Sequence, residues 1–189
     1  MRDKETLRTH LRALRNQLTK SEQKQASINL AQHIFSLGLL DDCDSLAVYL
    51  PNDGEIDPFV IVELARQHSI PVYLPVLDKD KIGHLNFHQW LPDTAFINNK
   101  FGIPEPVDTE QIDARQLHTV FVPLVGFDDK GGRLGMGGGF YDKTFEFERN
   151  SKNAARLIGL AHECQKVPAL ELEPWDIPMS QVVTDRGNY

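Results

Sequence analysis

Residues 131–142 read GGRLGMGGGFYD and hold six of the chain's thirteen glycines beside one arginine, Arg133. Glycine lets backbone N–H groups approach a ligand closely and adopts positive φ, so such a run can form an anion-binding concavity. The run follows an apolar stretch at 119–127 that is typical of a buried strand, and a helix is expected from Tyr141 onward. The order of strand, glycine loop and helix predicts a phosphate site, and a turning connection without a ligand is the alternative.

The segment matches neither of the two commonest glycine motifs. A P-loop ends in Gly-Lys-Ser/Thr, whereas Gly139 is followed by Phe140 and Tyr141. A dinucleotide fingerprint has glycines at positions i, i+2 and i+5, and Phe140 occupies the last of these positions here. The sequence also contains no Ser-His-Asp order and no nucleophile elbow. Generic Walker, Rossmann and serine-hydrolase sites are therefore excluded.

Two aspartates are suited to hold a hard cation. Asp142 comes directly after the glycine loop, and Asp176 lies in the segment EPWDIPMSQVV. Magnesium binds nucleotide phosphates through few protein oxygens and several waters, so two carboxylates are enough for such a site. Helix capping by Asp142 and solvation of Asp176 in a loop are the competing accounts.

Glu55 is a candidate on a second wall of the same cleft. It follows a predicted strand at 45–50 and lies in PNDGEID, which is rich in turn formers. In open α/β sheets ligands bind at the carboxyl ends of strands, so Glu55 and the glycine loop could face one another. An ordinary turn carboxylate is the alternative.

A first helix is predicted at the N-terminal end. Its apolar stripe recurs at spacings of four, three and four and should dock on the body of the protein. The stripe comprises Leu7, Leu11, Leu14 and Leu18. Lys4, Arg8, Arg12 and Arg15 follow the same period about a quarter turn away. For Arg12 and Arg15 a solvated basic face is the alternative to a binding role.

The remaining elements alternate between strand and helix. A capping box formed by Thr19 and Glu22 predicts a helix that continues to Gly38, and Asp57-Pro58 opens a helix to about residue 68. Further strands are predicted at 71–77, 156–161 and 181–184, and residues 78–118 are less regular. The prediction is an α/β fold across residues 1–189, a single domain with an open, mostly parallel sheet and helices on both faces, forming a three-layer sandwich.

Composition limits the class of protein. The chain has 189 residues, of which 41% are hydrophobic, and a formal net charge of -7 argues against a nucleic-acid or anionic-membrane binder. Cys43 and Cys164 are isolated, so neither a zinc ribbon nor a disulfide scaffold is indicated. No segment approaches the roughly 20 apolar residues of a membrane span. A cytoplasmic monomer that binds no nucleic acid and no membrane is expected.

Several segments together carry a family resemblance that covers most of the chain. They are Lys4-x-x-Leu7-Arg8, LPNDGEID at 50–57, FGIPEP at 101–106, VPLVGFDDKGGRLG at 122–135, RLGMGGGFYD at 133–142 and WDIPMSQVVT at 175–184. This set resembles the 5-formyltetrahydrofolate cyclo-ligase family, also called methenyltetrahydrofolate synthetases. The resemblance implies that ATP and Mg²⁺ are used to convert 5-formyltetrahydrofolate to 5,10-methenyltetrahydrofolate, with release of ADP and phosphate. It implies phosphoryl activation of the formyl oxygen, a step that needs no protein nucleophile.

The resemblance also implies a set of site residues. ATP would be bound by Lys4, Arg8, Arg133, Leu134, Gly135, Met136, Gly137, Gly138, Gly139, Phe140 and Tyr141. Folate would be bound by Leu50, Glu55, Phe101, Met136, Gly137, Gly138, Gly139 and Phe140. Arg133 and Tyr141 would act in catalysis, and Asp142 and Asp176 would hold magnesium.

Two features depart from some relatives, and two other functions are alternatives. Met136 and Gly138 stand where some relatives have basic residues, which leaves more of the phosphate charge to Lys4, Arg8 and Arg133. Phe140 precedes Tyr141 where some relatives have two tyrosines.

A non-catalytic RNA-binding protein would use the basic first helix, but the net charge of -7 and the lack of an aromatic–basic platform oppose it. An enzyme acting on a sugar phosphate or an acyl thioester without ATP is the other alternative.

Overall fold

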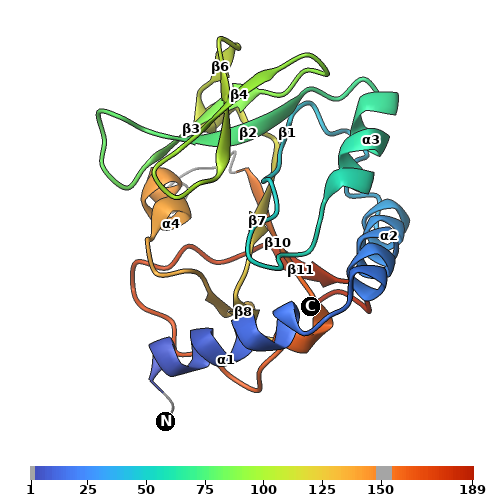
Figure 1. Cartoon of the computed structure of the whole chain (residues 1–189), viewed down its shortest axis with the longest axis vertical. Helices are drawn as coiled ribbons and strands as arrows, with labels where there is room; N and C mark the ends of the chain where they lie inside the picture. Colours follow the sequence, from blue (N-terminus) through green and yellow to red (C-terminus); the bar gives the residue numbers. More distant parts are fainter. Residues whose placement is uncertain (1–2, 148–154) are drawn as a thin grey trace.

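The computed structural model describes residues 3–147 and 155–189. Its centre is a seven-stranded sheet in the order β11-β10-β7-β1-β2-β3-β6 (Figure 1). The strands from β11 to β2 are mutually parallel, and β3 and β6 are antiparallel additions at one edge. The parallel strands are β1 (Leu46–Ala47), β2 (Val72–Leu77), β7 (Thr119–Pro123), β10 (Arg156–Ala161) and β11 (Gln181–Thr184). The mostly parallel α/β fold is thus confirmed.

Residues 78–118 are more regular than the sequence suggested. They form β3 (Leu85–Gln89), β4 (Ala95–Asn98), β5 (Pro104–Val107), β6 (Gln111–Ile112) and the short 3-10 helix η1 (Ala114–Gln116). β3 pairs antiparallel with β2, and β4 and β5 form a separate hairpin. The many Asp, Asn and Pro residues of this region lie mostly at the turns between short strands, which is why no long periodic run is visible in the sequence.

Three helices are close to their predicted positions. α1 (Lys4–Asn16) ends two residues before Leu18, α2 (Lys20–Ser36) follows the Thr19–Glu22 capping box, and α3 is Phe59–Gln67. The capping box is complete, because Glu22 N donates to Thr19 Oγ1 at 3.3 Å and Thr19 N donates to Glu22 Oε2 at 2.7 Å. None of the helices in the described residues is long and apolar enough to cross a membrane.

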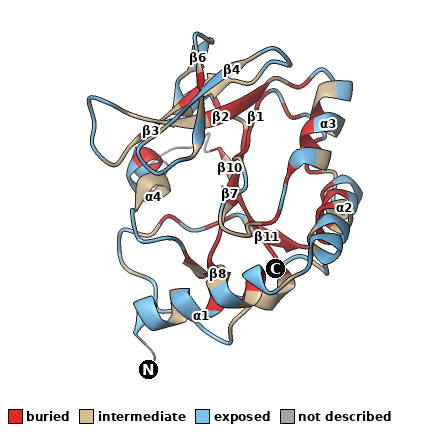
Figure 2. Cartoon of the chain, viewed as in Figure 1, coloured by how far each residue is buried: buried red, intermediate tan, exposed pale blue. Residues whose placement is uncertain are grey.

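The core occupies both faces of the sheet because side chains alternate along each strand. Phe121 packs on the side covered by α2 and α3, whereas its neighbours Val120 and Val122 pack on the opposite side with Phe145, which follows the short helix α4 (Phe140–Thr144). Figure 2 shows this buried centre running through the strands, with exposed residues on the outer sides of the helices. The sheet is therefore a rigid platform for the loops at its edges.

The predicted strand at 119–127 was wrong at its C-terminal end. β7 stops at Pro123, and Gly126–Phe127 forms a separate strand, β8, that pairs with β9 (Arg133–Leu134). Asp128 closes the turn between β8 and β9, because Oδ1 accepts from the N–H groups of Lys130 and Gly132. Gly131 and Gly132 therefore belong to a hairpin turn, and the glycine loop proper is residues 135–139.

Candidate functional site

Helix α1 lies across the edge of the sheet where the parallel strands end, next to β8 (Figure 1). Leu11 is 2% exposed and packs with Val125 and Leu134 at the start of the glycine loop. On the adjoining face, Arg8 Nε donates to Gly135 O at 2.9 Å. The Leu134 side chain is thereby buried against α1, so only its backbone is left to face a ligand.

The glycine loop has backbone conformations that require glycine. Gly137 has a φ of 95° and Gly139 a φ of 65°, both in the left-handed region. A Cβ atom on Gly137 would lie 3.5 Å from the Arg8 guanidinium, which places that cation directly beside the loop. Met136 is 54% exposed, so the rim of the loop is apolar on its solvent side.

Two aromatic rings meet at the exit of the glycine loop. The ring of Phe140 lies against Gly138, where a Cβ would come within 2.6 Å of it. Phe101, from the turn between β4 and β5, makes an edge-to-face contact with Phe140, with a centroid distance of 6.1 Å. Phe101 remains 56% exposed. The structure thus brings two residues 39 positions apart into one partly open aromatic corner.

Arg133 and the two aspartates form one cluster beside the loop. Arg133 is ion-paired with Asp142, whose Oδ1 also accepts from Ile177 N at 2.9 Å. Asp176 Oδ2 accepts from Glu173 N at 2.8 Å. Burial lowers the pKa of Arg133, and the negative charges of Asp142 and Asp176 act in the opposite direction. Lys4 reaches the same segment through an ion pair with Glu173 at 3.0 Å.

The donor set of this cluster suits a magnesium ion that is held partly by phosphate. Within residues 3–147 and 155–189, both hydrogen bonds to Asp142 go to Oδ1 and the one to Asp176 goes to Oδ2, so each carboxylate keeps a second oxygen. The same described residues contain no group of three or more His, Cys, Asp or Glu side chains that could hold a metal alone. Magnesium is commonly bound by one or two carboxylates together with phosphates and waters, so two aspartates beside an anion-binding loop fit it.

Glu55 and Tyr141 lie close enough for the charge of one to act on the other. The Glu55 side chain is 12% exposed, and its Oε2 accepts from Asn52 N at 3.1 Å. Burial raises the pKa of Glu55 to about 7, while the Asn52 N–H and the charge of Arg15 lower it. Burial also raises the pKa of the Tyr141 phenol, and the charge of Glu55 raises it further. The two predicted walls, the strand end at Glu55 and the glycine loop, are therefore close together.

Tyr49 and Leu50 complete the wall around Glu55. The Tyr49 hydroxyl donates to Ile56 O at 2.7 Å, and burial raises the pKa of this phenol strongly, with a contribution from the charge of Glu55. Leu50 is partly buried against the core. Tyr49 was missed in the sequence because SLAVYL is typical of a buried strand, and nothing in that pattern marks the tyrosine.

Arg15 is not on a solvated basic face, contrary to the alternative considered from the sequence. Its side chain is completely buried and donates to the carbonyl oxygens of Asp53 and Leu124. Arg12 is 40% exposed and pairs with the Asp53 carboxylate at 2.6 Å. Helical periodicity places Arg15 beside the leucine stripe but gives no signal of these partners, which come from two loops far away in the sequence.

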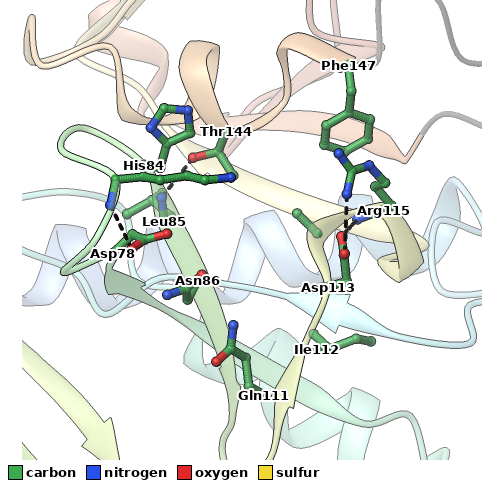
Figure 3. Close-up of a pocket in the computed structure, with 12 residues that line it drawn as sticks. Asp78, His84, Leu85, Asn86, Gln111, Ile112, Asp113, Arg115, Thr144 and Phe147 are labelled. Carbon is green, nitrogen blue, oxygen red and sulfur yellow. Dashed lines mark hydrogen bonds and ion pairs between the residues drawn. The ribbon is translucent and has the colours of Figure 1, made fainter.

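A cavity of about 290 Å³ lies away from this cluster, between β3, β6 and α4 (Figure 3). Much of its polar lining is already paired: Asp78 Oδ1 accepts from the N–H groups of Asp80 and Lys81, and Arg115 pairs with Asp113. The Arg115 guanidinium also stacks on Phe147 (Figure 3). None of the residues predicted to bind ATP, folate or magnesium lines this cavity.

Comparison with known proteins gives a consistent result. A model of the 5-formyltetrahydrofolate cyclo-ligase family matches residues 1–185. The chain is 38% identical over 183 residues to the 5-formyltetrahydrofolate cyclo-ligase of Haemophilus influenzae, covering 95% of this chain and 96% of the relative. For the Escherichia coli K12 enzyme of the same name the identity is 36% over 176 residues, with 92% and 96% covered. The NMR structure of Aquifex aeolicus 5,10-methenyltetrahydrofolate synthetase superposes with a TM-score of 0.83 at 26% identity, covering 98% of this chain and 91% of that one.

Proposed function

Since the chain belongs to the 5-formyltetrahydrofolate cyclo-ligase family, we propose that it converts 5-formyltetrahydrofolate to 5,10-methenyltetrahydrofolate, using ATP and Mg²⁺ and releasing ADP and phosphate. One observation carries the ATP-dependent part of this proposal. The cations of Arg8 and Arg133 and the carboxylates of Asp142 and Asp176 meet at a glycine loop, next to the buried Glu55. Phosphoryl transfer asks a protein for this combination of positive charge, metal ligands and exclusion of water.

In the proposed complex the ATP phosphates lie along the glycine loop. The backbone of Leu134 and of Gly135 to Gly139 would donate to phosphate oxygens, and Lys4, Arg8 and Arg133 would supply positive charge. The contact between Arg8 and Gly135 O at 2.9 Å supports this role, because it fixes the guanidinium beside the loop. Phe140 and Tyr141 would close the end of the nucleotide site as the chain enters α4.

Asp142 and Asp176 would hold the magnesium ion. When bound there, the ion would neutralise phosphate charge that the three cations leave uncompensated. Arg133 already pairs with Asp142, so its guanidinium lies beside the carboxylate that would hold the magnesium ion. From there it would contact the negative charge that develops on the transferring phosphoryl group. This arrangement supports a catalytic role for Arg133 in stabilising the transferring phosphoryl group.

The folate would lie between Glu55 and the aromatic corner. Glu55 would accept hydrogen bonds from the polar edge of the pterin, and the apolar rim would contact its faces. This rim comprises Leu50, Phe101, Met136, Gly137, Gly138, Gly139 and Phe140. The burial of Glu55 and its pKa of about 7 support a role in binding a ligand. A buried carboxylate without such a role would only destabilise the folded chain.

The chemistry then follows from the weak reactivity of a formyl group bound to nitrogen. The formyl oxygen attacks the γ-phosphorus of ATP and ADP leaves, so the oxygen becomes a phosphate ester. N10 of the folate attacks the activated carbon, loses its proton, and phosphate departs with the former formyl oxygen. Tyr141, whose phenol stays protonated at neutral pH, would donate a hydrogen bond near the reacting formyl group.

The experiment that tests this function follows the absorbance of methenyltetrahydrofolate with purified protein, 5-formyltetrahydrofolate and Mg-ATP. Product that requires all three components supports the proposal, and omission of each in turn is the control. A folded protein that forms no product from the complete mixture would refute it. The enzyme we propose is a cytoplasmic monomer, and light scattering should give the mass of one chain.

A further inference from the structure

Arg15 is a charged residue in a fully buried position. It lies in the last turn of α1 with 0% of its side chain exposed. Burying a guanidinium is costly unless hydrogen bonds and opposite charge compensate it. Here Nε donates to Asp53 O at 2.7 Å, Nη2 to Asp53 Oδ2 at 3.1 Å and Nη1 to Leu124 O at 3.1 Å. The side chain thus ties α1 to the loops that follow β1 and β7.

The turn at 52–55 is shaped against the end of α1. Asp53 and Gly54 both have positive φ, of 50° and 75°. A Cβ on Gly54 would lie 2.6 Å from Asn16 Oδ1 and 3.4 Å from Arg15 Cγ, so the turn has no space to move toward the helix. Asn16 Nδ2 also donates to Asp53 O at 3.2 Å. These contacts fix the backbone that leads directly into Glu55.

Glu55 depends on this turn for its direction. Its Oε2 is held by Asn52 N, and its Oε1 is 3.9 Å from Arg15 Nη2, beyond hydrogen-bond distance. Arg15 is therefore not the partner that neutralises Glu55 by direct contact. Arg15 bonds mainly to Asp53, which lies two residues before Glu55 in the chain. Its positive charge also favours the ionised form of Glu55 at longer range.

The same helix contacts the other wall of the site. Arg8 and Arg15 are seven residues apart, which is about two turns and about 10 Å along the helix, so they lie on nearly the same face. Arg8 donates to Gly135 O in the glycine loop, and Arg15 donates to the turn before Glu55. Helix α1 thus connects the glycine loop to the 52–55 turn.

From these contacts we infer that Arg15 is a positioning residue for the folate: it fixes the 52–55 turn on α1 and so aims the Glu55 carboxylate at the pterin. This role rests on the proposed function, in which Glu55 binds the folate. Arg15 itself touches neither substrate. Loss of its contacts should weaken folate binding while the nucleotide contacts at the other end of α1 remain.

The test is a double-mutant cycle between Arg15→Lys and Glu55→Gln, with folate and nucleotide affinities measured separately by calorimetry. Lysine keeps the charge but lacks the three separate nitrogens with which Arg15 bonds Asp53 O, Asp53 Oδ2 and Leu124 O. Arg15→Lys should therefore weaken the binding of 5-formyltetrahydrofolate at least about fivefold. Affinity for a non-hydrolysable ATP analogue should change less than about twofold. When position 55 is already glutamine, the Arg15→Lys effect on folate affinity should largely disappear.

Arg156→Lys is the matched control. Arg156 is also a partly buried arginine that donates to a backbone carbonyl, Leu39 O at 3.1 Å, but it lies at the start of β10, at the opposite ends of the parallel strands from the site. This variant should bind folate like the wild type. If Arg15→Lys does not fold, Asp53→Asn replaces it, since it removes the charge that Arg15 and Arg12 both contact at Asp53 Oδ2 and keeps the shape of the turn.

The outcomes separate the inference from the function on which it rests. A folded Arg15→Lys protein with wild-type folate affinity would overturn the positioning role, provided that Glu55→Gln alone weakens folate. An equal loss of affinity with glutamate or glutamine at position 55 would also overturn it, because the effect would then be merely structural. If Glu55→Gln alone leaves folate affinity unchanged, the folate contact of Glu55 is wrong and the role of Arg15 falls with it.

Discussion

Replacing Glu55 by glutamine should stabilise the protein at neutral and alkaline pH. Burial raises the pKa of this carboxyl group from 4.5 to about 7 in the folded chain. Between these two values the unfolded chain has lost the proton that the folded chain retains. The protonated Glu55 carboxyl group therefore contributes its full amount to the free energy of unfolding below a pH of about 4.5. This contribution falls as the pH rises to about 7 and stays low above that.

The size of the effect follows from the difference between the two pKa values. A difference between 4.5 and about 7 corresponds to roughly 3 kcal/mol of unfolding free energy, lost across this pH window. Because the side chain is only 12% exposed, solvent screening reduces this figure little. Glutamine does not titrate, so the unfolding free energy of the variant should not fall for this reason as the pH rises. At neutral and alkaline pH the variant should therefore be more stable than the wild type.

Urea unfolding at pH values from 5 to 8 measures this directly. The stability of the wild type minus that of Glu55→Gln should fall by roughly 2.5 kcal/mol between these limits, because part of the titration lies below pH 5, and the subtraction removes the contributions of all other groups. Glu63→Gln is the control, since Glu63 is 49% exposed on α3 and pairs with Arg66. A difference for Glu55→Gln that does not change with pH would refute the assignment of a buried, ligand-directed carboxylate.

Other changes test separate parts of the structure. Arg133→Ala should lower turnover more than about tenfold with the fold intact by circular dichroism, and wild-type turnover would remove Arg133 from the mechanism. Gly137→Ala should cost about 1–2 kcal/mol in urea unfolding and weaken ATP, because its φ of 95° is strained for alanine. Thr19→Ala should cost about 1 kcal/mol by loss of the capping box, and an unchanged midpoint would contradict that contact. Chelation of magnesium should abolish turnover, and Asp142→Asn should raise the magnesium concentration needed to restore it; activity that survives chelation would exclude the ion.

The fold could be predicted largely from local patterns. The capping box at Thr19 and the apolar runs at 71–77, 156–161 and 181–184 gave elements that the structure confirms, because each signal lies within a few residues. The apolar run at 119–127 predicted one strand, which was wrong at its C-terminal end. Apolar composition does not reveal that the chain leaves the sheet after Pro123 and that Gly126–Phe127 pairs with Arg133–Leu134. Pairing between distant segments has no local signature.

The site was predicted less completely for the same reason. Gly135–Gly139, Arg133 and Asp142 fall within one short segment of the chain, so their proximity followed from the sequence. For Arg15 the sequence left a binding role and a solvated basic face open, and the structure instead buries it completely against Asp53 and Leu124. Periodicity gives the face of a helix on which a residue lies, but it does not give the loop that packs there.

The fate of the formyl oxygen tests the central claim most directly. 5-Formyltetrahydrofolate carrying ¹⁸O in its formyl group is converted by the protein with Mg-ATP, and the released phosphate is analysed by mass spectrometry. If ATP activates the formyl oxygen by phosphorylation, one labelled oxygen per turnover appears in inorganic phosphate. Unlabelled phosphate together with labelled water would show that ATP hydrolysis and ring closure are separate events, and would contradict the mechanism.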